Sequence, residues 1–327
     1  MLYAPIIIPT LSRSTHFIRC IESLRRNTWA KYTDVYIGVD YPSADKYKAG
    51  HQTICEYLQG KFPEFKSMNI IYRESNMGAS QNVDDMRKTI LTQYDRFIYA
   101  EDDIEFAPNF LEYIDTCLTR YEDDPDVIAV SGYSYPLQWK TSEGATIFRE
   151  DFICPAWGTG YWTQKHQDIR TYMESGGLAH EYHRVRKTKA FKRMLQSSKK
   201  EYVNVCLYEN CTSELVRRTT DISMRMYSVI YNKYIITPVI SKTRNWGMDG
   251  SGLYCKDNTN ELHGNTAKTF NYSSQVIDNQ NSFKCIEDTL CDIAYNKKLM
   301  DKFEAIPFTS RIKTNIKALI YRICKAK

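Results

Sequence analysis

The sequence predicts an α/β fold in which a mixed, mostly parallel sheet is flanked by helices. Over residues 1–131, short apolar runs alternate with apolar residues at helical spacing, a pattern typical of strand–helix–strand units. Polar and acidic residues directly follow several of these runs, at the strand ends where parallel sheets bind their ligands. With 327 residues, 43% hydrophobic and 25% charged, the chain is long and apolar enough to bury a sizeable core.

The predicted elements of this first part follow one another in a regular order. Strands are expected at the short apolar runs Tyr3–Ile8, Asp34–Val39, Met68–Tyr72, Arg96–Ala100 and Val127–Ser131. Helices are expected at Phe17–Leu24, Ile54–Phe62, Ser80–Tyr94 and Pro108–Tyr121. Proline is expected to end the first strand at Pro9 and the second helix at Pro63. Because helices alternate with strands, both faces of the sheet should be covered.

From residue 132 onward the pattern loosens. The segment Ile153–Trp162 is rich in Gly and Trp, and Glu214–Tyr231 predicts one or two helices. A late strand is expected at Tyr234–Ser241, followed by the glycine-rich loop Arg244–Gly252. We expect one continuous domain over residues 1–260, with halves 1–131 and 132–260, and a C-terminal extension over 261–327.

Two basic segments stand out in the second half. Residues 184–200 hold eight Lys and Arg and no acid, and residues 311–327 hold six on an apolar repeat that includes Ile312 and Ile316. Such a basic amphipathic tail is able to lie on an anionic membrane surface, although two solvated helices explain the same pattern. The net charge of +5 is a mild bias, and no nucleic-acid partner is expected.

Cysteine usage and the lack of long apolar stretches bear on the compartment. The ten cysteines are scattered, without a CxxC pair or a His at metal-ligand spacing, so a structural zinc site is not expected. No apolar run approaches the ~18 residues of a membrane-spanning helix, and the N-terminus lacks the pattern of a signal peptide. We therefore expect reduced thiols in a cytosolic protein.

The sharpest feature is the acidic segment Glu101-Asp102-Asp103-Ile104-Glu105, directly after the predicted strand Arg96–Ala100. Adjacent carboxylates repel one another and must be solvated or bound to a cation. One interpretation is a solvated acidic turn. The other is a Mg²⁺ or Mn²⁺ site, because hard divalent cations take one or two carboxylates together with phosphate oxygens and water.

These segments resemble the nucleotide-sugar-dependent glycosyltransferases of the GT-A fold, a Rossmann-like family whose "DxD" acids follow the fourth strand. The segment EDDIEFAPNFLEYI looks like the corresponding part of the Golgi N-acetylglucosaminyltransferase I family, and IIIPTLSRSTHFIRCIESL resembles its first strand and helix. TDISMRMY, followed by ITPVISKT and a glycine-rich loop, is similar as well. The resemblance covers residues 3–130 and 219–252.

The resemblance implies a role for each acid of the triplet. Asp103, the last acid, would be the direct ligand of Mn²⁺ or Mg²⁺. Asp102 would lie near the donor sugar or ribose, and Glu101 near the sugar hydroxyls. Residues 1–131 would then bind the nucleotide-sugar and residues 132–260 the acceptor.

The same resemblance places the other nucleotide-sugar-binding residues at neighbouring strand ends. Thr10 and Arg13 follow the first strand, and the Arg13 guanidinium would face the diphosphate. Asp40 would accept a hydrogen bond from the base, which favours uracil. Asn76 and Gly78 lie in NMGASQN, which is similar to the N-x-G loop of family 2 enzymes. Taken alone, Arg13 is also explained as a helix surface charge and Gly78 as an ordinary turn glycine.

Asp221 is the candidate catalytic base. Asp221-Ile222-Ser223-Met224-Arg225 has the family's spacing between an Asp and a following Arg. An inverting transferase needs a carboxylate that takes the proton of the attacking hydroxyl. A helix N-cap after Thr219-Thr220 is the alternative. The sequence lacks the family's aromatic residues on either side of this Asp.

Three residues are candidates for acceptor binding or for a lid. Trp157 is suited to stacking on a sugar face, although a core Trp is an equal alternative. Trp246 and Asp249 lie in Lys242–Gly252, whose glycines predict a mobile loop that orders over the donor, with Lys242 or Arg244 reaching the diphosphate. A plain hairpin loop and a turn Asp are the alternatives.

Together these expectations describe a metal-dependent, inverting hexosyl- or N-acetylhexosaminyltransferase. It would move a sugar from a UDP-sugar to a glycan or a lipid-linked glycan, in bacterial capsule or lipopolysaccharide assembly, at the cytoplasmic face of the membrane. A sugar-nucleotide pyrophosphorylase would need a glycine-rich loop after the first strand, where this chain has PTLSRSTHF. A non-catalytic glycan-binding protein of the same fold remains the other alternative, distinguishable by its lack of metal-dependent UDP binding.

Overall fold

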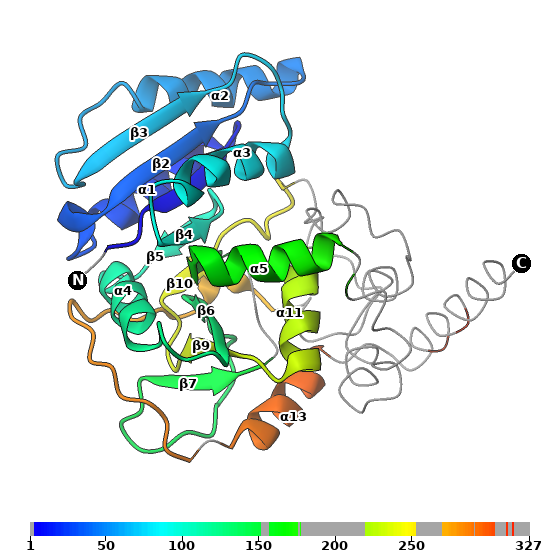
Figure 1. Cartoon of the computed structure of the whole chain (residues 1–327). Helices are drawn as coiled ribbons and strands as arrows, with labels where there is room; N and C mark the ends of the chain where they lie inside the picture. Colours follow the sequence, from blue (N-terminus) through cyan, green and yellow to red (C-terminus); the bar gives the residue numbers. More distant parts are fainter. Residues whose placement is uncertain are drawn as a thin grey trace, which may run out of the picture.

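The structure is a computed structural model, and it describes residues 3–151, 157–175, 177, 220–252, 270–290, 292–304, 312 and 316. The main sheet joins strands β1 (Ile6–Thr10), β2 (Asp34–Val39), β3 (Ser67–Tyr72), β4 (Arg96–Ala100), β6 (Val127–Ser131), β7 (Ile147–Glu150), β8 (Trp157–Trp162) and β9 (Tyr234–Pro238). Their order is β3-β2-β1-β4-β8-β6-β9-β7 (Figure 1). Strand β8 is antiparallel to β4 and β6, and β7 is antiparallel to β9, whereas the other pairs are parallel. The predicted mixed, mostly parallel sheet is therefore confirmed.

A second, two-stranded sheet lies beside the acidic segment. It pairs β5 (Ile104–Phe106) with β10 (Thr243–Asn245) in antiparallel register, so that Ile104 lies opposite Asn245. This pairing joins segments about 140 positions apart in the sequence, and it fixes the chain that follows β9 next to the acids that follow β4.

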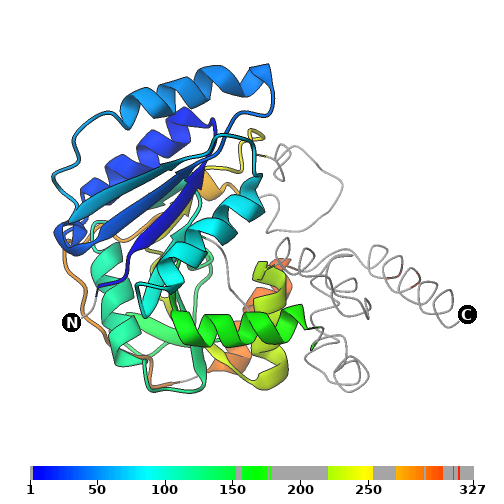
Figure 2. The same ribbon diagram turned by 45° about the horizontal axis from the view of Figure 1, so that its top comes forward.

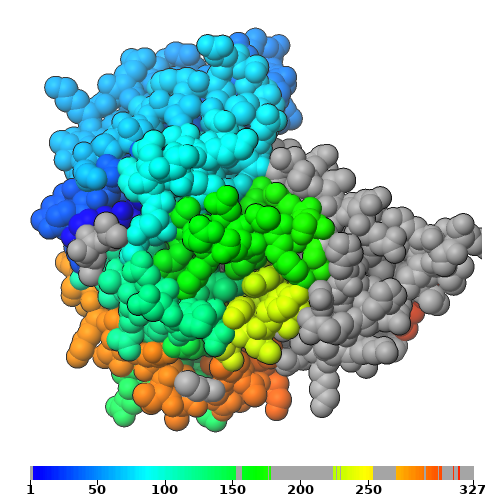
Figure 3. Space-filling view, viewed as in Figure 1, coloured from blue at the N-terminus to red at the C-terminus, as the bar shows by residue number. Residues whose placement is uncertain are grey.

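Helices cover both faces of the main sheet. They are α1 (Ser14–Arg25), α2 (Asp45–Tyr57), α3 (Ala79–Leu91), α4 (Phe110–Arg120), α5 (Thr163–Glu174), α11 (Thr220–Tyr231) and α13 (Ile293–Glu304), with short 3₁₀ turns at Ala30–Tyr32 and Tyr272–Ser274. Helices α1 and α2 lie over one face and α3 and α5 over the other (Figure 2). Figure 3 shows α3, α5 and α11 side by side on the molecular surface.

Alternation along the strands explains the two cores. Ile6 and Ile8 of β1 contact the core under α1, α2 and α4, whereas Ile7 between them belongs to the core under α3, α5 and α11. Successive side chains of a strand point to opposite faces, so a continuous apolar run is what a strand covered on both faces requires.

Several predicted boundaries are wrong for local reasons. Strand β1 continues through Pro9, because β4 pairs only with Ile6 and Ile7 and the missing Pro9 N–H costs no ladder bond on that side. Helix α2 begins at Asp45 and ends at Tyr57, although apolar spacing predicts Ile54–Phe62. The segment 153–162, which shows no strand pattern, contains β8, and Thr243–Asn245 is strand β10, although the sequence predicts a loop over 244–252.

Residues from the predicted C-terminal extension contact the sheet. Thr146 N–H donates to the Ile286 carbonyl at 2.8 Å, and Ile147 forms a bridge with Glu287 beyond β7. Asn109, which immediately precedes α4, donates to Asp278 Oδ2 at 3.1 Å. The boundary at residue 260 stays a prediction. No helix in the described part of the chain is both long and apolar enough to cross a bilayer. The cysteines described there, Cys20, Cys55, Cys117 and Cys285, are free.

Candidate functional site

The carboxyl ends of β1 and β4 meet at a buried cluster of charges. Thr10, the last residue of β1, donates its hydroxyl to Asp102 Oδ2 at 2.8 Å. Arg13, which immediately precedes α1, places its guanidinium on both acids. Its Nη2 contacts Asp102 Oδ1, and its Nη1 lies 2.8 Å from Asp103 Oδ2. Burial opposes the charge on Arg13, but the two carboxylates outweigh it and raise the pKa of Arg13. The structure thus brings together three of the predicted nucleotide-sugar-binding residues and the predicted metal ligand.

Asp103 is the most enclosed acid of the segment. Its side chain is buried, and its Oδ1 atom has no hydrogen-bond partner in the described part of the chain. Burial raises the pKa of Asp103, although Arg13 opposes this shift. Glu101 is half-buried, and its carbonyl lies 3.9 Å from the Cys20 thiol.

Asp40 plays a role that the sequence does not predict. Its Oδ1 accepts the backbone N–H groups of Tyr41 at 2.9 Å and Met77 at 2.8 Å. Its Oδ2 accepts from the Asn76 side chain at 3.2 Å and from the Gly78 N–H at 2.9 Å. Gly78 has φ of +76°, a backbone state that favours glycine, immediately before α3. Asp40 therefore holds the 76–78 loop in place, and its hydrogen bond to a base stays a prediction.

The segment after β10 closes over Asp103. The Trp246 N–H donates to the Asp103 carbonyl at 2.9 Å, and its indole N–H donates to Glu105 Oε2 at 2.8 Å. A Cβ atom on Gly247 would lie 1.9 Å from Asp103 Oδ2, so only glycine permits this close approach of the backbone.

The two cations expected to reach the diphosphate are engaged elsewhere. Lys242 is buried in an ion pair with Asp278. Arg244 donates from Nε to the Gln275 carbonyl at 2.8 Å, and its Nη1 lies 3.4 Å from Glu105. Both side chains are therefore paired with groups of the protein, and a contact of either with the diphosphate stays a prediction.

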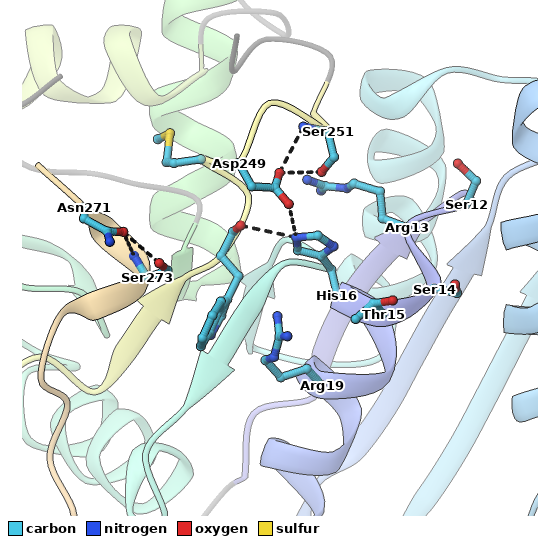
Figure 4. Close-up of a pocket in the computed structure, with 12 residues that line it drawn as sticks. Ser12, Arg13, Ser14, Thr15, His16, Arg19, Asp249, Ser251, Asn271 and Ser273 are labelled. Atoms are coloured by element: carbon cyan, nitrogen blue, oxygen red, sulfur yellow. Dashed lines mark hydrogen bonds and ion pairs between the residues drawn. The ribbon is translucent and has the colours of Figure 1, made fainter. Parts of the chain in front are cut away.

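A cavity of about 950 Å³ opens beside this cluster (Figure 4). Its walls come from the start of α1, the segment after β10 and the turn at Tyr272–Ser274. The lining residues are Ser12, Arg13, Ser14, Thr15, His16, Arg19, Trp246, Met248, Asp249, Ser251, Asn271 and Ser273. Hydroxyl, amide, guanidinium and indole groups together suit a polar, phosphate- or sugar-bearing ligand.

Two residues of α1, His16 and Arg19, contact the opposite wall of the cavity. His16 Nε2 lies 3.1 Å from Asp249 Oδ2 and 3.2 Å from the Trp246 carbonyl. The Arg19 guanidinium stacks over the Trp246 ring, 4.0 Å from its centre. Burial works against ionisation of Asp249, but hydrogen bonds from Ser251 and the nearby His16 lower its pKa. The predicted lid residues Trp246 and Asp249 therefore do line the cavity.

Trp157 lies at the same edge of the sheet, opposite Ala100 at the end of β4. Its ring packs edge-on against Tyr133, with centres 4.7 Å apart, and against Tyr272. It is not among the residues that line the cavity, so its sugar contact stays a prediction. Asp221 lies in the first turn of α11, and its side chain is outside the described residues. The basic run 184–200 and nearly all of the tail 311–327 are outside them too.

Sequence reasoning misses His16, Arg19 and Gly247. The start of the helix after the first strand carries a basic residue or a histidine at every third position, namely Arg13, His16 and Arg19. This spacing puts them on one face of the helix, and it could have indicated a binding surface there. Gly247 shows no such signal, because its importance depends on how closely β10 brings it to Asp103.

The side chains available as ligands determine how a metal ion would be held. Among the described residues, no group of three or more His, Cys, Asp or Glu side chains is arranged to hold a metal ion. The unpartnered Oδ1 atom of Asp103 is one suitable oxygen ligand. A divalent cation held by one or two carboxylates and by substrate phosphates fits this arrangement, whereas a cage made by the described side chains alone does not.

No protein-family model matches the sequence, and no curated protein matches it. Among solved structures, the chain is similar to TarS of S. aureus, with 11% identity over 51% of this chain and 29% of that chain and a TM-score of 0.34. A structure of S. aureus TarS with UDP-GlcNAc gives 15% identity, coverage of 51% and 48%, and a TM-score of 0.36. The mannosyltransferase PcManGT from Pyrobaculum calidifontis, in complex with GDP-Man and Mn²⁺, gives 11% identity, coverage of 70% and 74%, and a TM-score of 0.38. The match spans less than half of either TarS chain, and likenesses of this degree carry no argument about function.

Proposed function

We propose that this protein is a metal-dependent, inverting glycosyltransferase that moves a sugar from a UDP-sugar to a hydroxyl of a glycan or lipid-linked glycan. The observation that carries the proposal is the buried cluster of Arg13, Asp102 and Asp103 at the ends of β1 and β4, beside a cavity of about 950 Å³. In parallel sheets, this edge is where nucleotide and phosphate ligands bind.

Each residue of the cluster has a chemical task in such a transfer. Arg13 lines the cavity, and its planar guanidinium is suited to the oxygens of a departing diphosphate. Asp103 would hold Mn²⁺ or Mg²⁺ through its unpartnered oxygen, with Asp102 beside it. When bound, the cation would supply positive charge that stabilises the leaving diphosphate. Trp246 and Gly247 cover the acids and would exclude water that otherwise hydrolyses the donor.

We assign proton abstraction from the acceptor to Asp221, at the start of α11. A general base of this kind contributes about 10²- to 10⁴-fold to the rate. The sugar, the acceptor and a place in bacterial capsule or lipopolysaccharide assembly are proposals that rest on the sequence resemblance. An N-terminal cap of α11 is the alternative task for Asp221.

The first test is calorimetric titration of UDP with and without Mn²⁺. We expect wild-type protein to bind UDP only when Mn²⁺ is present, and Asp103→Ala to lose this binding. Asp45→Ala is the matched control, because Asp45 is an exposed carboxylate of α2 that pairs with Lys48 and not with Arg13. Metal-dependent binding that survives Asp103→Ala would remove Asp103 from the metal site, and wild-type protein that binds glycans but no nucleotide would favour a glycan-binding protein.

The second test separates the two tasks of Asp221. We expect Asp221→Asn to bind UDP as the wild type does and to transfer sugar about 10²- to 10⁴-fold more slowly. Thermal unfolding of the same variant shows whether α11 has lost a cap. A large drop in melting temperature with unchanged turnover per folded molecule would support the cap.

A further inference from the structure

Two buried acids share one guanidinium. Among the described residues, Arg13 is the cation whose side chain contacts both Asp102 and Asp103. Both carboxylates are buried, where an uncompensated charge is costly. The Arg13 guanidinium therefore occupies the place beside both carboxylates that a bound divalent cation would take.

The Arg13 contact also blocks access to Asp103. The Nη1 atom of Arg13 lies 2.8 Å from Asp103 Oδ2, and the Gly247 backbone is so close that an added Cβ would lie 1.9 Å from the same oxygen. That Cβ would lie 3.0 Å from Arg13 Nη1 as well, so Gly247 packs against the ion pair itself. Asp103 Oδ1 is buried and has no hydrogen-bond partner among the described residues. A cation would reach Asp103 only after Arg13 or the Gly247 backbone moves.

We propose that Arg13 and the divalent cation exchange places at Asp102 and Asp103, a step that rests on the function proposed above. In the metal-free protein, Arg13 holds the acid pair together. In the loaded protein, Asp102 and Asp103 would hold the cation, and the released guanidinium would bind the diphosphate. Arg13 already lines the cavity and immediately precedes α1, so we expect its side chain to turn while the helix stays in place.

Exchange makes metal and nucleotide binding depend on each other. Metal alone must displace Arg13 from two carboxylates without gaining a new partner for the guanidinium. When a nucleotide diphosphate is also present, the guanidinium finds phosphate oxygens. By thermodynamic linkage, UDP then raises the affinity for Mn²⁺ by the same factor by which Mn²⁺ raises the affinity for UDP. Arg13 acts here as a positioning residue that transmits this coupling.

The experiment is a binding cycle of Mn²⁺ and UDP, measured by calorimetry, with the free Mn²⁺ followed by electron paramagnetic resonance. For Mn²⁺ alone, we expect Arg13→Ala to bind about 10- to 100-fold more tightly than wild type, because a charge-assisted competitor has been removed. For UDP in saturating Mn²⁺, we expect the same variant to bind about 10-fold more weakly. The coupling factor between the two ligands should fall accordingly.

Arg19→Ala is the matched control. Arg19 lines the same cavity and carries the same charge, but it stacks on Trp246 instead of contacting the acid pair. The Arg19→Ala variant measures how much the Mn²⁺ affinity rises when one positive charge is lost from the cavity, without a change at the acid pair. Added methylguanidinium should weaken the binding of Mn²⁺ to Arg13→Ala, because it can take the place of the missing Arg13 guanidinium beside the two carboxylates.

Arg13→Lys is a second variant that keeps a cation at the buried acids if Arg13→Ala does not fold. A lysine ammonium lacks the fork that spans both carboxylates, so Mn²⁺ affinity should rise to a value between wild type and Arg13→Ala. Mn²⁺ binding by the folded Arg13 variants that is no tighter than that of Arg19→Ala would overturn the exchange.

The outcomes separate this proposal from the function on which it rests. Metal-dependent UDP binding by wild type, without a gain in Mn²⁺ affinity in the Arg13 variants, would leave the transferase standing and overturn the exchange. A gain in Mn²⁺ affinity without UDP binding by any variant would support exchange at a metal site and overturn the transferase.

Discussion

Asp115 of α4 is a buried acid with a structural task. Its Oδ1 accepts the backbone N–H of Ala4 at 2.8 Å and so ties the start of the chain to α4. Its Oδ2 has no hydrogen-bond partner in the described part of the chain. Burial raises the pKa of Asp115 to about 7, against the opposing effects of the Ala4 hydrogen bond and the Arg96 charge. The carboxyl group is therefore protonated in the folded protein at mildly acidic pH.

This pKa predicts how stability depends on pH. Because the pKa of Asp115 is higher in the folded protein than in the unfolded chain, its contribution is fully present below about pH 4 and is lost as pH rises through about 7. We expect the free energy of unfolding of Asp115→Asn, relative to wild type, to increase by roughly 2–4 kcal/mol between pH 4 and pH 8. Urea unfolding of both proteins at several pH values measures this difference. Asp45→Asn, an exposed acid on α2, is the control, and stability curves of wild type and Asp115→Asn that run parallel over this range would contradict the assignment.

For single residues, the sequence predicts the position of the acids in the site better than it predicts which groups hydrogen-bond to them. Asp102 and Asp103 are predictable because they directly follow an apolar strand, and Arg13 because it follows the neighbouring one. Asp40 is equally well located, but its four hydrogen-bond donors come from Tyr41 and the 76–78 loop. Hydrogen bonds that depend on the path of a loop cannot be predicted from the order of the strands.

Among the elements, β8 shows why some strands escape prediction. Glycines interrupt its apolar pattern, yet the packing requires them. A Cβ on Gly160 would lie 2.7 Å from Ile114 Cγ2, and one on Gly158, where φ is +83°, would lie 3.0 Å from Phe110. Helix α4 therefore packs directly on the β8 backbone, and a local sequence pattern cannot report this tertiary contact. Strands β2, β4 and β6 are well predicted because continuous apolar runs suit burial on both faces.

The segment after β9 divides into a fixed part and a part suited to closing over a ligand. Residues 243–245 pair with β5. Beyond them, Trp246, Met248, Asp249 and Ser251 line the cavity, and Asp249 reaches across it to His16. We expect hydrogen exchange at 246–252 to slow at least about 10-fold when UDP-sugar and Mn²⁺ are added together, because ligand contacts raise the free energy of local opening. The amides of 243–245 should stay protected throughout and serve as an internal reference.

Gly247→Ala should loosen the packing of the same segment against Asp103. The added Cβ must push the backbone away from Asp103, so we expect faster exchange at 246–252 without ligand and a smaller slowing with it. Exchange that is equally slow, or equally fast, with and without UDP-sugar and Mn²⁺ would show that the segment does not close over the donor.

On the scale of the whole molecule, one sheet unites both halves of the chain. Strand β8 of the second half lies between β4 and β6 of the first, and β9 pairs with β6. The fold class follows from strand–helix alternation in the sequence. The insertion of β8 between β4 and β6 does not, because it depends on contacts between segments far apart in the chain. Such an arrangement brings the acids after β4 and the segment after β9 to one edge, where the cavity lies.

The basic tail extends the proposal from the site to the whole protein. Residues 311–327 carry six Lys and Arg and no acid. Ile312 and Ile316, one helical turn apart, are 42% and 50% exposed. Exposed apolar residues at this spacing among basic ones are typical of a helix that lies in a membrane interface. We therefore propose that the tail binds an anionic lipid surface, where a lipid-linked acceptor would be found.

Binding of the tail to vesicles should depend on both its charges and its apolar residues. Each Lys or Arg near an anionic surface contributes about 1 kcal/mol, so the tail should hold the protein on vesicles rich in phosphatidylglycerol at low salt and release it at high salt. We expect cosedimentation of the full chain and at least about 10-fold weaker partitioning of a chain that ends at residue 310. Substitution of Ile312 and Ile316 by Ser, with every charge kept, should weaken binding at high salt more than at low salt, because the apolar contribution is not screened.

Titration with UDP and Mn²⁺ checks that the truncated protein is folded, since its nucleotide affinity should equal that of the full chain. If both chains partition equally onto anionic vesicles, some other surface binds the membrane and the tail is a solvated helix.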